Sequence, residues 1–530
     1  MDLALKEDID SGKSVLEVCI FEGQNQVDFK YISHDFDIYD KDGNILEADF
    51  KKSHLYRLKI KEAVLSEFEY YIVLHESENR EFIKNKTSKY KKTLKKVFYR
   101  EIGGNVLDKK KIITNNRKYV CLAGPYNSED EAKSQLVKYG ELNHCRMHKK
   151  KIKEGILSLE MFDPDGENVY EFNSSVKIIP KNISAEFELH HLHVNKRIKK
   201  RPVYENLFYQ GGLTIRVDSD GKLAGINIVG VEDYIKGVLI SEISGNVSLE
   251  FAKSMAVVCR SNIYARYGQR HYNESFDFCN DGHCMRYFGK EFANDVIKDA
   301  VSATENKVIA YNDKICDAFY SYSCGGHTDT VGGVWLRDDT EYLQGRMDND
   351  KEASEIYDLT KEDDLKKWVL GRPDVFCNLI SQPALASMSD GATSFRWEVF
   401  YTREELHSII KQKTGEDVGL IYELIPVERS VSGRIKEIQI LGSLKNITIM
   451  GELNIRSALS QSRLKSSCFI IESEMDGDGV PYNFTLIGCG VGHGIGLCKV
   501  GASVMAKKGK NFEQILKHYY EKCHIKRIEN

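Results

Sequence analysis

The glycine-rich stretch GCGVGHGIGLCKVGASVMAKKG, residues 488–509, constrains the fold more than any other feature. Five glycines fall within residues 488–496 and surround His493, and an alanine-rich helical segment follows. Glycine is unfavourable in regular structure, so such a run indicates a backbone that turns tightly or approaches a ligand closely. A phosphate-binding loop is excluded, because no Gly-Lys-Ser/Thr follows. Two interpretations remain: a loop that presents backbone N–H groups to a ligand, or a strand-to-helix corner in which His493 packs.

Composition limits the class of protein. With 530 residues, 42% of them hydrophobic, the chain is long enough for two to four domains with cores of their own. The net charge of −4 does not favour a nucleic-acid partner. We find no window of 18 apolar residues that predicts a transmembrane helix, and the start, MDLALKEDIDSGK, has no signal-peptide hydrophobic region. The 13 cysteines form no compact paired framework, so most are expected to be reduced and buried.

The predicted fold class is α+β, and the pattern divides the chain into three parts. Residues 1–100 are expected to form a small α+β unit, and residues 101–200 a second one followed by a linker. Beyond Pro202 a larger domain of mixed strands and helices is expected over 201–526. Within it, residues 351–430 are polar and partly helical, and they are interpreted as an insertion.

Three local signals fix element boundaries within these parts. KYVCLAGPYNSEDEAKSQLVKYGEL is interpreted as a strand, a Gly-Pro turn and a helix capped near Ser128. SLEFAKSMAVVCRSNIYARYG has apolar residues at helical spacing, with Ser248 as N-cap. A hairpin with its turn at Asn312 and Asp313 is expected in VIAYNDKICDAFYSYS.

Glu242, in the segment LISEIS, is a candidate general acid. A carboxyl group between Ile240 and Ile243 is expected to be partly desolvated, which raises its pKa and allows it to donate a proton near neutral pH. The alternative is an ordinary exposed loop glutamate.

Cys279, His283 and Cys284, in FDFCNDGHCMRYFG, resemble a metal-ligand cluster. Zinc binds thiolate and imidazole and takes four ligands in a structural site, and His271 is the nearest candidate for the fourth. The alternative is a pair of packed thiols beside a hydrogen-bonding histidine.

SYSCGGHTDT, residues 321–330, contains a Gly-Gly turn beside Ser323, Cys324 and His327. Cys324 and His327 could form a nucleophile pair. Such pairs are usually distant in sequence, which weakens this interpretation.

Taken together, these segments resemble the SpoIID family (stage II sporulation protein D; SpoIID/LytB domain) from about Tyr204 to Ile525. The matching motifs occur in order: VEDYIKGVLISEI, FAKSMAVVCRSNIYA, CNDGHCMRYFG, SYSCGGHTDTVGGVW, SGRIKEIQI, GHGIGLCKVGASVMAKKG and ILKHYY. The resemblance implies a SpoIID-like α+β catalytic core in which Glu242 is the catalytic residue and the Cys/His segment binds zinc.

The same resemblance implies a peptidoglycan lytic transglycosylase. Such an enzyme cleaves the β-1,4 bond between N-acetylmuramic acid and N-acetylglucosamine in glycan stripped of stem peptides, and it leaves a 1,6-anhydro end. Glu242 would protonate the leaving oxygen and then accept the proton of the muramoyl 6-hydroxyl, so that no second carboxylate is needed. We expect a groove that gathers the catalytic glutamate with substrate-binding residues Tyr287, Ser323, Gly325, Gly492, His493 and Gly494.

The chain departs from the family pattern in several places. The tryptophan usual after the glutamate motif is absent from SGNVSLEF, and Val491 stands where an aromatic residue precedes the histidine. Lys499 and Val500 replace the usual glutamine and tyrosine. These departures concern substrate affinity more than fold. In the N-terminal region, LAGPYNSEDEAKSQL is faintly similar to glycan-binding SPOR domains, and an unrelated α+β unit is the alternative.

Two other functions compete with the transglycosylase. One is a non-catalytic glycan-binding protein that modulates a cell-wall hydrolase, and the other is a hydrolase that uses Cys324 and His327. The expected partners are peptidoglycan glycan strands and other cell-wall hydrolases. The family resemblance implies a cell-envelope, extracytoplasmic location.

Overall fold

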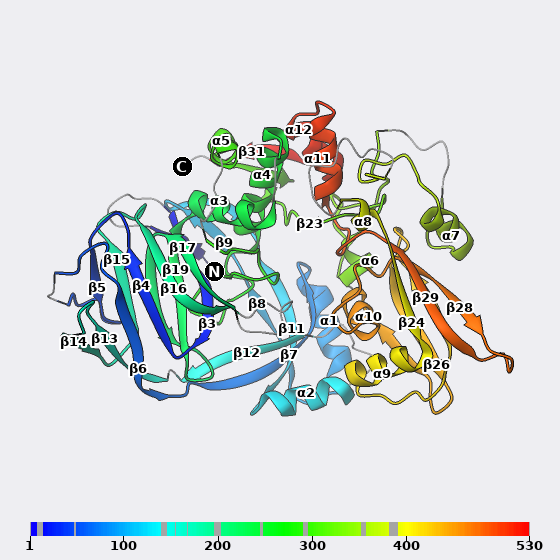
Figure 1. Ribbon diagram of the computed structural model, residues 1–530, viewed down its shortest axis with the longest axis horizontal. Helices are drawn as coiled ribbons and strands as arrows, with labels where there is room; N and C mark the ends of the chain where they lie inside the picture. Colours follow the sequence, from blue (N-terminus) through cyan, green and yellow to red (C-terminus); the bar gives the residue numbers. More distant parts are fainter. Residues whose placement is uncertain are drawn as a thin grey trace.

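The computed structural model (Figure 1) is a mixed arrangement of sheets and helices, which confirms the α+β prediction. It describes residues 2–7, 14–46, 49–138, 146–153, 155–166, 168–194, 203–243, 247–289, 295–335, 337–350, 357–380 and 391–528.

Two large sheets form the left side of the molecule in Figure 1 and share one hydrophobic core. The first has the order β2-β3-β19-β18-β15-β5, with β20 paired to β3. Its strands are β2 (Lys6–Glu7), β3 (Ser14–Gln24), β5 (Phe36–Tyr39), β15 (Val176–Pro180), β18 (Gly212–Val217), β19 (Leu223–Gly230) and β20 (Phe278–Cys279). The second has the order β14-β13-β6-β4-β16-β17. Its strands are β4 (Gln26–Tyr31), β6 (Tyr56–Val64), β13 (Ile156–Phe162), β14 (Val169–Phe172), β16 (Glu186–Val194) and β17 (Val203–Gln210).

A smaller α/β unit lies at the lower centre of Figure 1. Its sheet has the order β12-β7-β11-β8, and α1 and α2 contact this sheet. The Ser128 hydroxyl accepts a hydrogen bond from the Glu131 N–H (3.1 Å), which confirms the predicted cap of α2. The elements are β7 (Glu67–Ser77), α1 (Arg80–Tyr90), β8 (Val97–Ile102), β11 (Lys118–Tyr126), α2 (Glu129–Lys138) and β12 (Arg146–Lys153). A separate three-stranded sheet contains β1 (Asp2–Ala4), β9 (Asn105–Asp108) and β10 (Lys111–Asn115).

The sheets cross the boundaries predicted at residues 100 and 200. Strand β3 pairs with β19 over most of its length, so a strand of the N-terminal region lies in the same sheet as the hairpin that opens the SpoIID-like region. Strands β4 and β6 likewise join β13 and β16 in one sheet. Local patterning predicts that a segment is a strand but not which distant strand it pairs with, because pairing depends on long-range packing.

A layer of helices lies against these sheets and contains α4, the most deeply buried helix. The Ser248 hydroxyl accepts from the Phe251 N–H (3.4 Å), as predicted, and nearly every residue of α4 is buried. Helices α3, α5, α11 and α12 contact α4 (Figure 1). The helices are α3 (Val231–Glu242), α4 (Leu249–Arg266), α5 (Asp295–Ala303), α11 (Lys499–Lys507) and α12 (Phe512–Tyr519).

Short strands connect this layer to its surroundings. Strands β21 and β22 form the predicted hairpin, and its turn residues Asn312 and Asp313 both have positive φ, as a tight hairpin turn requires. The strands are β21 (Lys307–Tyr311), β22 (Lys314–Ile315), β23 (Tyr320–Ser321), β30 (Leu497–Cys498) and β31 (His524–Arg527).

The right side of the molecule in Figure 1 has its own core, made of residues between Trp397 and Leu486. Residues 357–380 and 391–430 include the helices α7, α8 and α9. Strands β24 and β25 also lie there, and they pair with later strands as far as Cys489. Residues 351–356 and 381–390 of the predicted insertion lie outside the described residues. The elements are α6 (Val331–Trp335), α7 (Glu362–Leu370), α8 (Gly391–Phe395), β24 (Arg396–Thr402), α9 (Arg403–Thr414), β25 (Ile421–Arg429), β26 (Ile435–Gly442), β27 (Ile447–Met450), α10 (Glu452–Ala458), β28 (Phe469–Met475) and β29 (Pro481–Cys489).

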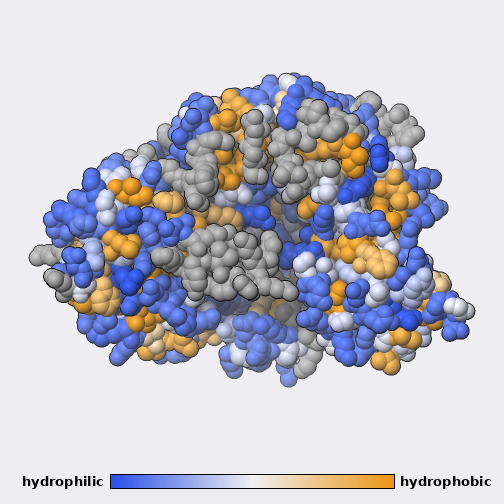
Figure 2. All heavy atoms as spheres, viewed as in Figure 1, coloured by the Kyte–Doolittle hydropathy of each residue, from blue (hydrophilic) through white to orange (hydrophobic). Residues whose placement is uncertain are grey.

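Hydrophilic residues cover most of the face shown in Figure 2, and apolar residues appear there in small groups. Among the described helices, none combines the length and the hydropathy that a membrane span needs.

Candidate functional site

Glu242 is the last residue of α3, and the fold holds it at the wall of a cavity. The buried face of α3, with Tyr234, Val238 and Leu239, packs into the main core and fixes the end of the helix. Only 10% of the Glu242 side chain is exposed. Its Oε1 atom lies 3.4 Å from the backbone N–H of Arg286. The structure therefore places Glu242 as a largely desolvated carboxyl group rather than as an exposed loop residue.

Lys499 is the closest charged partner of Glu242. Its Nζ atom lies 2.9 Å from the carboxylate Oε2 and 2.8 Å from the Glu242 carbonyl oxygen, and 7% of its side chain is exposed. The ammonium group thus also satisfies a carbonyl at the C-terminus of α3, where a positive charge is favourable. Since Oε2 is held by Lys499, the other carboxylate oxygen is the one near Arg286.

The cavity beside Glu242 has a volume of about 780 Å³. Segments far apart in the sequence form its wall, among them the end of α3, the segment at β23 and the glycine-rich loop. Strands β23 and β30 pair in parallel, with Tyr320 opposite Leu497, which brings the last two segments together. Glu242 and His493, 251 positions apart, therefore line one cavity, as the sequence led us to expect. Other lining residues are His283, Cys284, Tyr320, Tyr322, Trp335, Gly492 and Lys499.

His493 faces the cavity but uses its ring to hold the loop. Its Nδ1 atom accepts a hydrogen bond from the Ile495 N–H (3.0 Å), and its ring packs on Trp335 at 4.8 Å. Burial and the positive charges of Arg434 and Arg456 lower the pKa of His493 to about 3. The imidazole is therefore neutral near pH 7, and no contact with Glu242 is among its interactions in the described part of the chain.

Ser323, Gly325 and Gly494 lie behind the cavity wall rather than on it. The backbones of Ser323 and Val491 exchange two hydrogen bonds (3.1 and 2.8 Å). Gly325 has φ +78°, and a Cβ atom there would lie 2.8 Å from the Gly490 nitrogen. These glycines let two segments of the chain approach each other, which differs from the expected approach to a sugar ring. Gly492, with φ +95°, does line the cavity.

Tyr287, expected at the substrate, is a core residue. Only 2% of it is exposed, and its hydroxyl donates to Asn227 Oδ1 (2.8 Å). Its ring packs on Tyr234 of α3, and a Cβ atom at Gly237 would lie 2.3 Å from it. Tyr287 thus supports the helix that carries Glu242, and it is not among the residues that line the cavity.

Arginines give the cavity a positive character. Arg266, Arg270, Arg286, Arg337, Arg456 and Arg463 line it. Burial, together with the charges of Arg266 and Arg337, lowers the pKa of Arg270 to about 10. The two other carboxylates on the wall are paired with arginine: Glu76 with Arg337 (2.8 Å) and Glu452 with Arg456 (3.1 Å).

The four predicted metal ligands come together. The ligand atoms of His271, Cys279, His283 and Cys284 all lie within 4.8 Å of one another. His271 Nε2 lies 3.3 Å from Cys284 Sγ, and His283 Nδ1 lies 3.6 and 3.8 Å from the sulfur atoms of Cys284 and Cys279. Ligands of a tetrahedral zinc ion, bonded at about 2.0–2.3 Å, are separated by about 3.3–3.8 Å. The donor set and its spacing therefore fit zinc, and contact with the Cys279 thiol lowers the pKa of Cys284.

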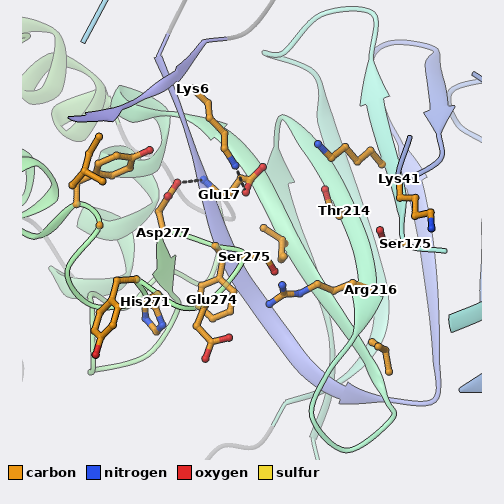
Figure 3. A pocket seen from close by; sticks show the side chains of 18 of the residues that line it. Lys6, Glu17, Lys41, Ser175, Thr214, Arg216, His271, Glu274, Ser275 and Asp277 are labelled. Atoms are coloured by element: carbon orange, nitrogen blue, oxygen red, sulfur yellow. Dashed lines mark hydrogen bonds and ion pairs between the residues drawn. The ribbon is translucent and has the colours of Figure 1, made fainter. Parts of the chain in front are cut away.

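This cluster separates two cavities. His283 and Cys284 line the cavity of Glu242, whereas His271 lines a second one of about 900 Å³ (Figure 3). In the second cavity Lys6 pairs with Glu17 (2.5 Å), and Asp277 accepts a hydrogen bond from the Glu17 N–H. Neither Glu242 nor His493 reaches it.

The proposed nucleophile pair does not form an accessible site in the described structure. Cys324 is buried and contacts Asp348 and Cys377, and His327 Nδ1 contacts the Thr328 carbonyl oxygen (2.8 Å). Neither residue lines the cavity of Glu242.

Two protein-family models match the part of the chain that contains this site. Residues 219–311, which include Glu242 and the Cys/His cluster, match the family model described as "Stage II sporulation protein". The chain carries a SpoIID domain. Residues 329–496, which include His493, match a second model, described as a domain of unknown function (DUF8618).

Three relatives cover much of the same length. An uncharacterised protein of Brachyspira hyodysenteriae is 27% identical over 314 residues, 59% of this chain and 70% of that protein. The amidase enhancer of Bacillus subtilis is 24% identical over 54% of this chain and 39% of its own. Stage II sporulation protein D of Bacillus subtilis is 23% identical over 56% of this chain and 74% of its own. The SpoIID domain of this chain is thus distantly homologous to both Bacillus subtilis proteins.

Sequence reasoning missed three groups of residues on the cavity wall: Lys499, the tyrosines Tyr320 and Tyr322, and the arginines. Lys499 stood out only as a departure from the family pattern. Its ammonium group lies 5.7 and 5.5 Å from the centres of the Tyr320 and Tyr322 rings, so it is enclosed by aromatic faces and the carboxylate.

Proposed function

We propose that this protein is a peptidoglycan lytic transglycosylase that acts on peptide-free glycan strands. The observation that carries the proposal is Glu242, a largely buried carboxyl group at the wall of a 780 Å³ cavity in the SpoIID domain. It would cleave the β-1,4 bond between N-acetylmuramic acid and N-acetylglucosamine and leave 1,6-anhydro ends.

One carboxyl group suffices for this chemistry. As an acid, Glu242 gives its proton to the glycosidic oxygen as the C1–O4 bond breaks. As a carboxylate, it then takes the proton of the muramoyl 6-hydroxyl as the C1–O6 bond forms, and no water is consumed. Hydrolytic glycosidases of the usual kind employ a second carboxyl group beside the first, whereas the other two carboxylates on the described wall, Glu76 and Glu452, form ion pairs with Arg337 and Arg456. This difference supports the intramolecular reaction.

Lys499 would act as a positioning residue for Glu242. By holding Oε2 it leaves Oε1 as the oxygen that meets the substrate, and its positive charge stabilises the carboxylate that accepts the second proton.

The arginines support glycan without stem peptides as the substrate. Removing a stem peptide converts the lactyl amide of N-acetylmuramic acid into a carboxylate, so the glycan itself then carries a negative charge on each muramoyl residue. Arg286 lines the cavity and is exposed, and the half-buried Arg270 on the same wall adds to the positive field. Arginine binds carboxylates through paired hydrogen bonds.

Zinc is the proposed occupant of the Cys/His cluster, with His271, Cys279, His283 and Cys284 as ligands. When bound, it would fix the loop that ends near Arg286 and hold the wall between the two cavities. The proposed location is the cell envelope, outside the cytoplasm, where the glycan partner and other cell-wall hydrolases are found. A role in sporulation belongs to the same proposal.

The test is mass spectrometry of purified peptide-free glycan strands after incubation with the protein. We expect 1,6-anhydromuramoyl products from the unaltered chain. Glu242→Gln cannot exchange the proton, so product formation should fall by at least about a hundredfold. Glu423→Gln, at an exposed position of β25, is the matched control and should leave turnover unchanged. Near-normal turnover by Glu242→Gln would overturn the assignment.

A second candidate is a non-catalytic glycan-binding protein that modulates a cell-wall hydrolase, as the name of the relative called amidase enhancer suggests. The same experiment separates the two. Binding of strands without new ends favours the modulator, and ordinary reducing ends would indicate a hydrolase.

A further inference from the structure

A second group of metal-ligand side chains lies in the core, apart from the cavity of Glu242. It consists of Cys324, Asp348, Cys377 and Cys498, all buried, whose ligand atoms lie within 4.8 Å of one another. The four residues come from different segments: the turn after β23, the loops at 348 and 377, and the end of β30. Such convergence cannot arise from the local sequence.

We propose that these four residues form a structural zinc site. The Cys324 and Cys377 sulfur atoms are 3.6 Å apart, and Cys324 Sγ lies 3.4 Å from Asp348 Oδ2. Zinc–sulfur bonds of about 2.3 Å at tetrahedral angles separate two sulfur ligands by about 3.8 Å, and a sulfur from an oxygen by about 3.5 Å. Both distances therefore match edges of a zinc tetrahedron. Three thiolates favour zinc over calcium or magnesium, which prefer oxygen ligands.

Hydrogen bonds from neighbouring groups orient two of the four side chains, as is usual for the ligands of metal sites. The Cys498 sulfur, which is the N-cap of α11, accepts from the backbone N–H groups of Gly501 (3.4 Å) and Cys324 (3.3 Å). A thiolate is favoured at a helix N-terminus. The Tyr519 hydroxyl donates to Asp348 Oδ1 (2.7 Å) and leaves Oδ2 facing Cys324.

The buried negative charge of Asp348 also favours a bound cation at this site. Its carboxylate is fully buried, and within the described residues its ion-pair partner is His518, 3.5 Å away, rather than a lysine or an arginine. A buried carboxylate next to three thiols is costly unless a positive charge lies among them. A bound divalent ion supplies that charge. With four protein ligands the site is closed, which is typical of structural rather than catalytic zinc.

The site would also bear on Glu242. Cys498 directly precedes Lys499, and its partners Asp348 and Cys377 lie in the segment before the core of β24–β29. A metal here fastens the start of α11 to that segment and so fixes the backbone that carries Lys499.

The alternative is a disulfide between Cys324 and Cys377. The pair Cys468–Cys489, with sulfur atoms 3.1 Å apart, offers a comparison, because in the described part of the chain it belongs to neither group of potential metal ligands. Cys468→Ser is therefore the matched control for a buried cysteine change.

Metal content of the full chain, purified without added zinc, gives the first test. We expect two zinc equivalents by elemental analysis and native mass spectrometry. Cys377→Ser should retain one, the Cys279→Ser/Cys284→Ser double variant should retain one, and Cys468→Ser should retain two. One equivalent in the unaltered chain, lost entirely in the Cys279→Ser/Cys284→Ser variant, would overturn the proposal.

A second measurement does not depend on whether Cys377→Ser folds. Cobalt is added to the Cys279→Ser/Cys284→Ser variant, which keeps the buried group intact. Thiolate-to-cobalt charge-transfer absorption with the visible bands of tetrahedral cobalt supports the site, and their absence contradicts it. Thiol alkylation of the denatured, unreduced protein that finds Cys324 and Cys377 joined as a disulfide would also overturn it.

Discussion

At the scale of single residues, the Glu242–Lys499 ion pair links the proposed acid to the stability of the fold. The two side chains are about nine-tenths buried and make one ion pair, and Lys499 also binds the end of α3. A buried pair contributes little net stability, but removing one partner leaves an uncompensated charge. The same contact that orients Glu242 therefore makes each residue dependent on the other.

This dependence predicts a double-mutant result. Lys499→Gln should lower the free energy of unfolding by about 3 kcal/mol, because it leaves the Glu242 carboxylate buried without its partner. The Glu242→Gln/Lys499→Gln double variant should recover part of that loss. Urea unfolding of all four proteins gives the coupling energy. Strictly additive effects would contradict a direct ion pair in solution.

His493 predicts a pH effect on stability. Its pKa is about 3 in the folded protein against about 6.5 unfolded, so the unfolded state binds a proton between these values. Stability should therefore fall as the pH falls from 6.5 towards 3. His493→Gln should reduce the difference between unfolding free energies at pH 7 and 4.5 by about 2 kcal/mol. His54→Gln, at an exposed position, is the control, and an effect of equal size in both variants would refute this explanation.

At the scale of elements, the glycine-rich loop and the segment at β23 form one unit. Backbone pairs join Ser323 to Val491 and Asp329 to Ile495, continuing the pairing of β23 with β30. Several glycines have positive φ there, so the chain turns repeatedly while the two backbones stay in contact. The loop is thus a packed element in which the backbone of Gly492 and the side chain of His493 reach the cavity.

A comparison of Gly494 and Gly509 distinguishes the cost of backbone strain from the cost of a steric clash. Gly494 (φ +77°) and Gly509 (φ +86°) both have left-handed backbones, but a Cβ atom at 494 would lie 2.3 Å from the Arg434 guanidinium carbon, whereas at 509 it meets nothing within 4 Å. Gly509→Ala should cost about 1 kcal/mol of stability, and Gly494→Ala about 3 kcal/mol. Chemical denaturation measures both. Equal costs would show that Arg434 moves aside.

At the scale of the whole molecule, the N-terminal region completes the SpoIID-like core. β3 lies between β2 and β19, and its residues Leu16, Val18 and Ile20 are buried in the main core. β20, which carries Cys279, pairs with β3 through Val18 and Cys19. The strand therefore also supports the proposed zinc loop.

This arrangement predicts that the matched family region does not fold alone. A fragment of residues 203–530 leaves β19 without β3 and exposes its share of the main core. We expect no cooperative thermal transition and no fixed aromatic environment by near-ultraviolet circular dichroism, whereas the full chain shows both. A fragment that melts cooperatively and cleaves glycan would contradict this view.

The sequence by itself determined the features that depend on neighbours along the chain. The helix caps at Ser128 and Ser248 and the turn at Asn312 and Asp313 are where the residue types predicted them, because each uses hydrogen bonds or dihedral preferences within a few residues. The Cys/His cluster was also visible, since three of its ligands lie within six residues. The ordered motifs were enough to predict the SpoIID domain.

Only the tertiary structure decided which distant residues meet. Tyr287 is an aromatic residue of the type that often contacts sugars, but it packs behind α3. Lys499 is recognisable in the sequence only as a departure from the family pattern, yet it forms the ion pair with Glu242. The pairing of β3 with β19 and the meeting of Cys324 with Cys377 depend on how sheets and loops pack across hundreds of positions. Burial and long-range contacts depend on the whole fold, so the spacing of residues within a short segment cannot predict them.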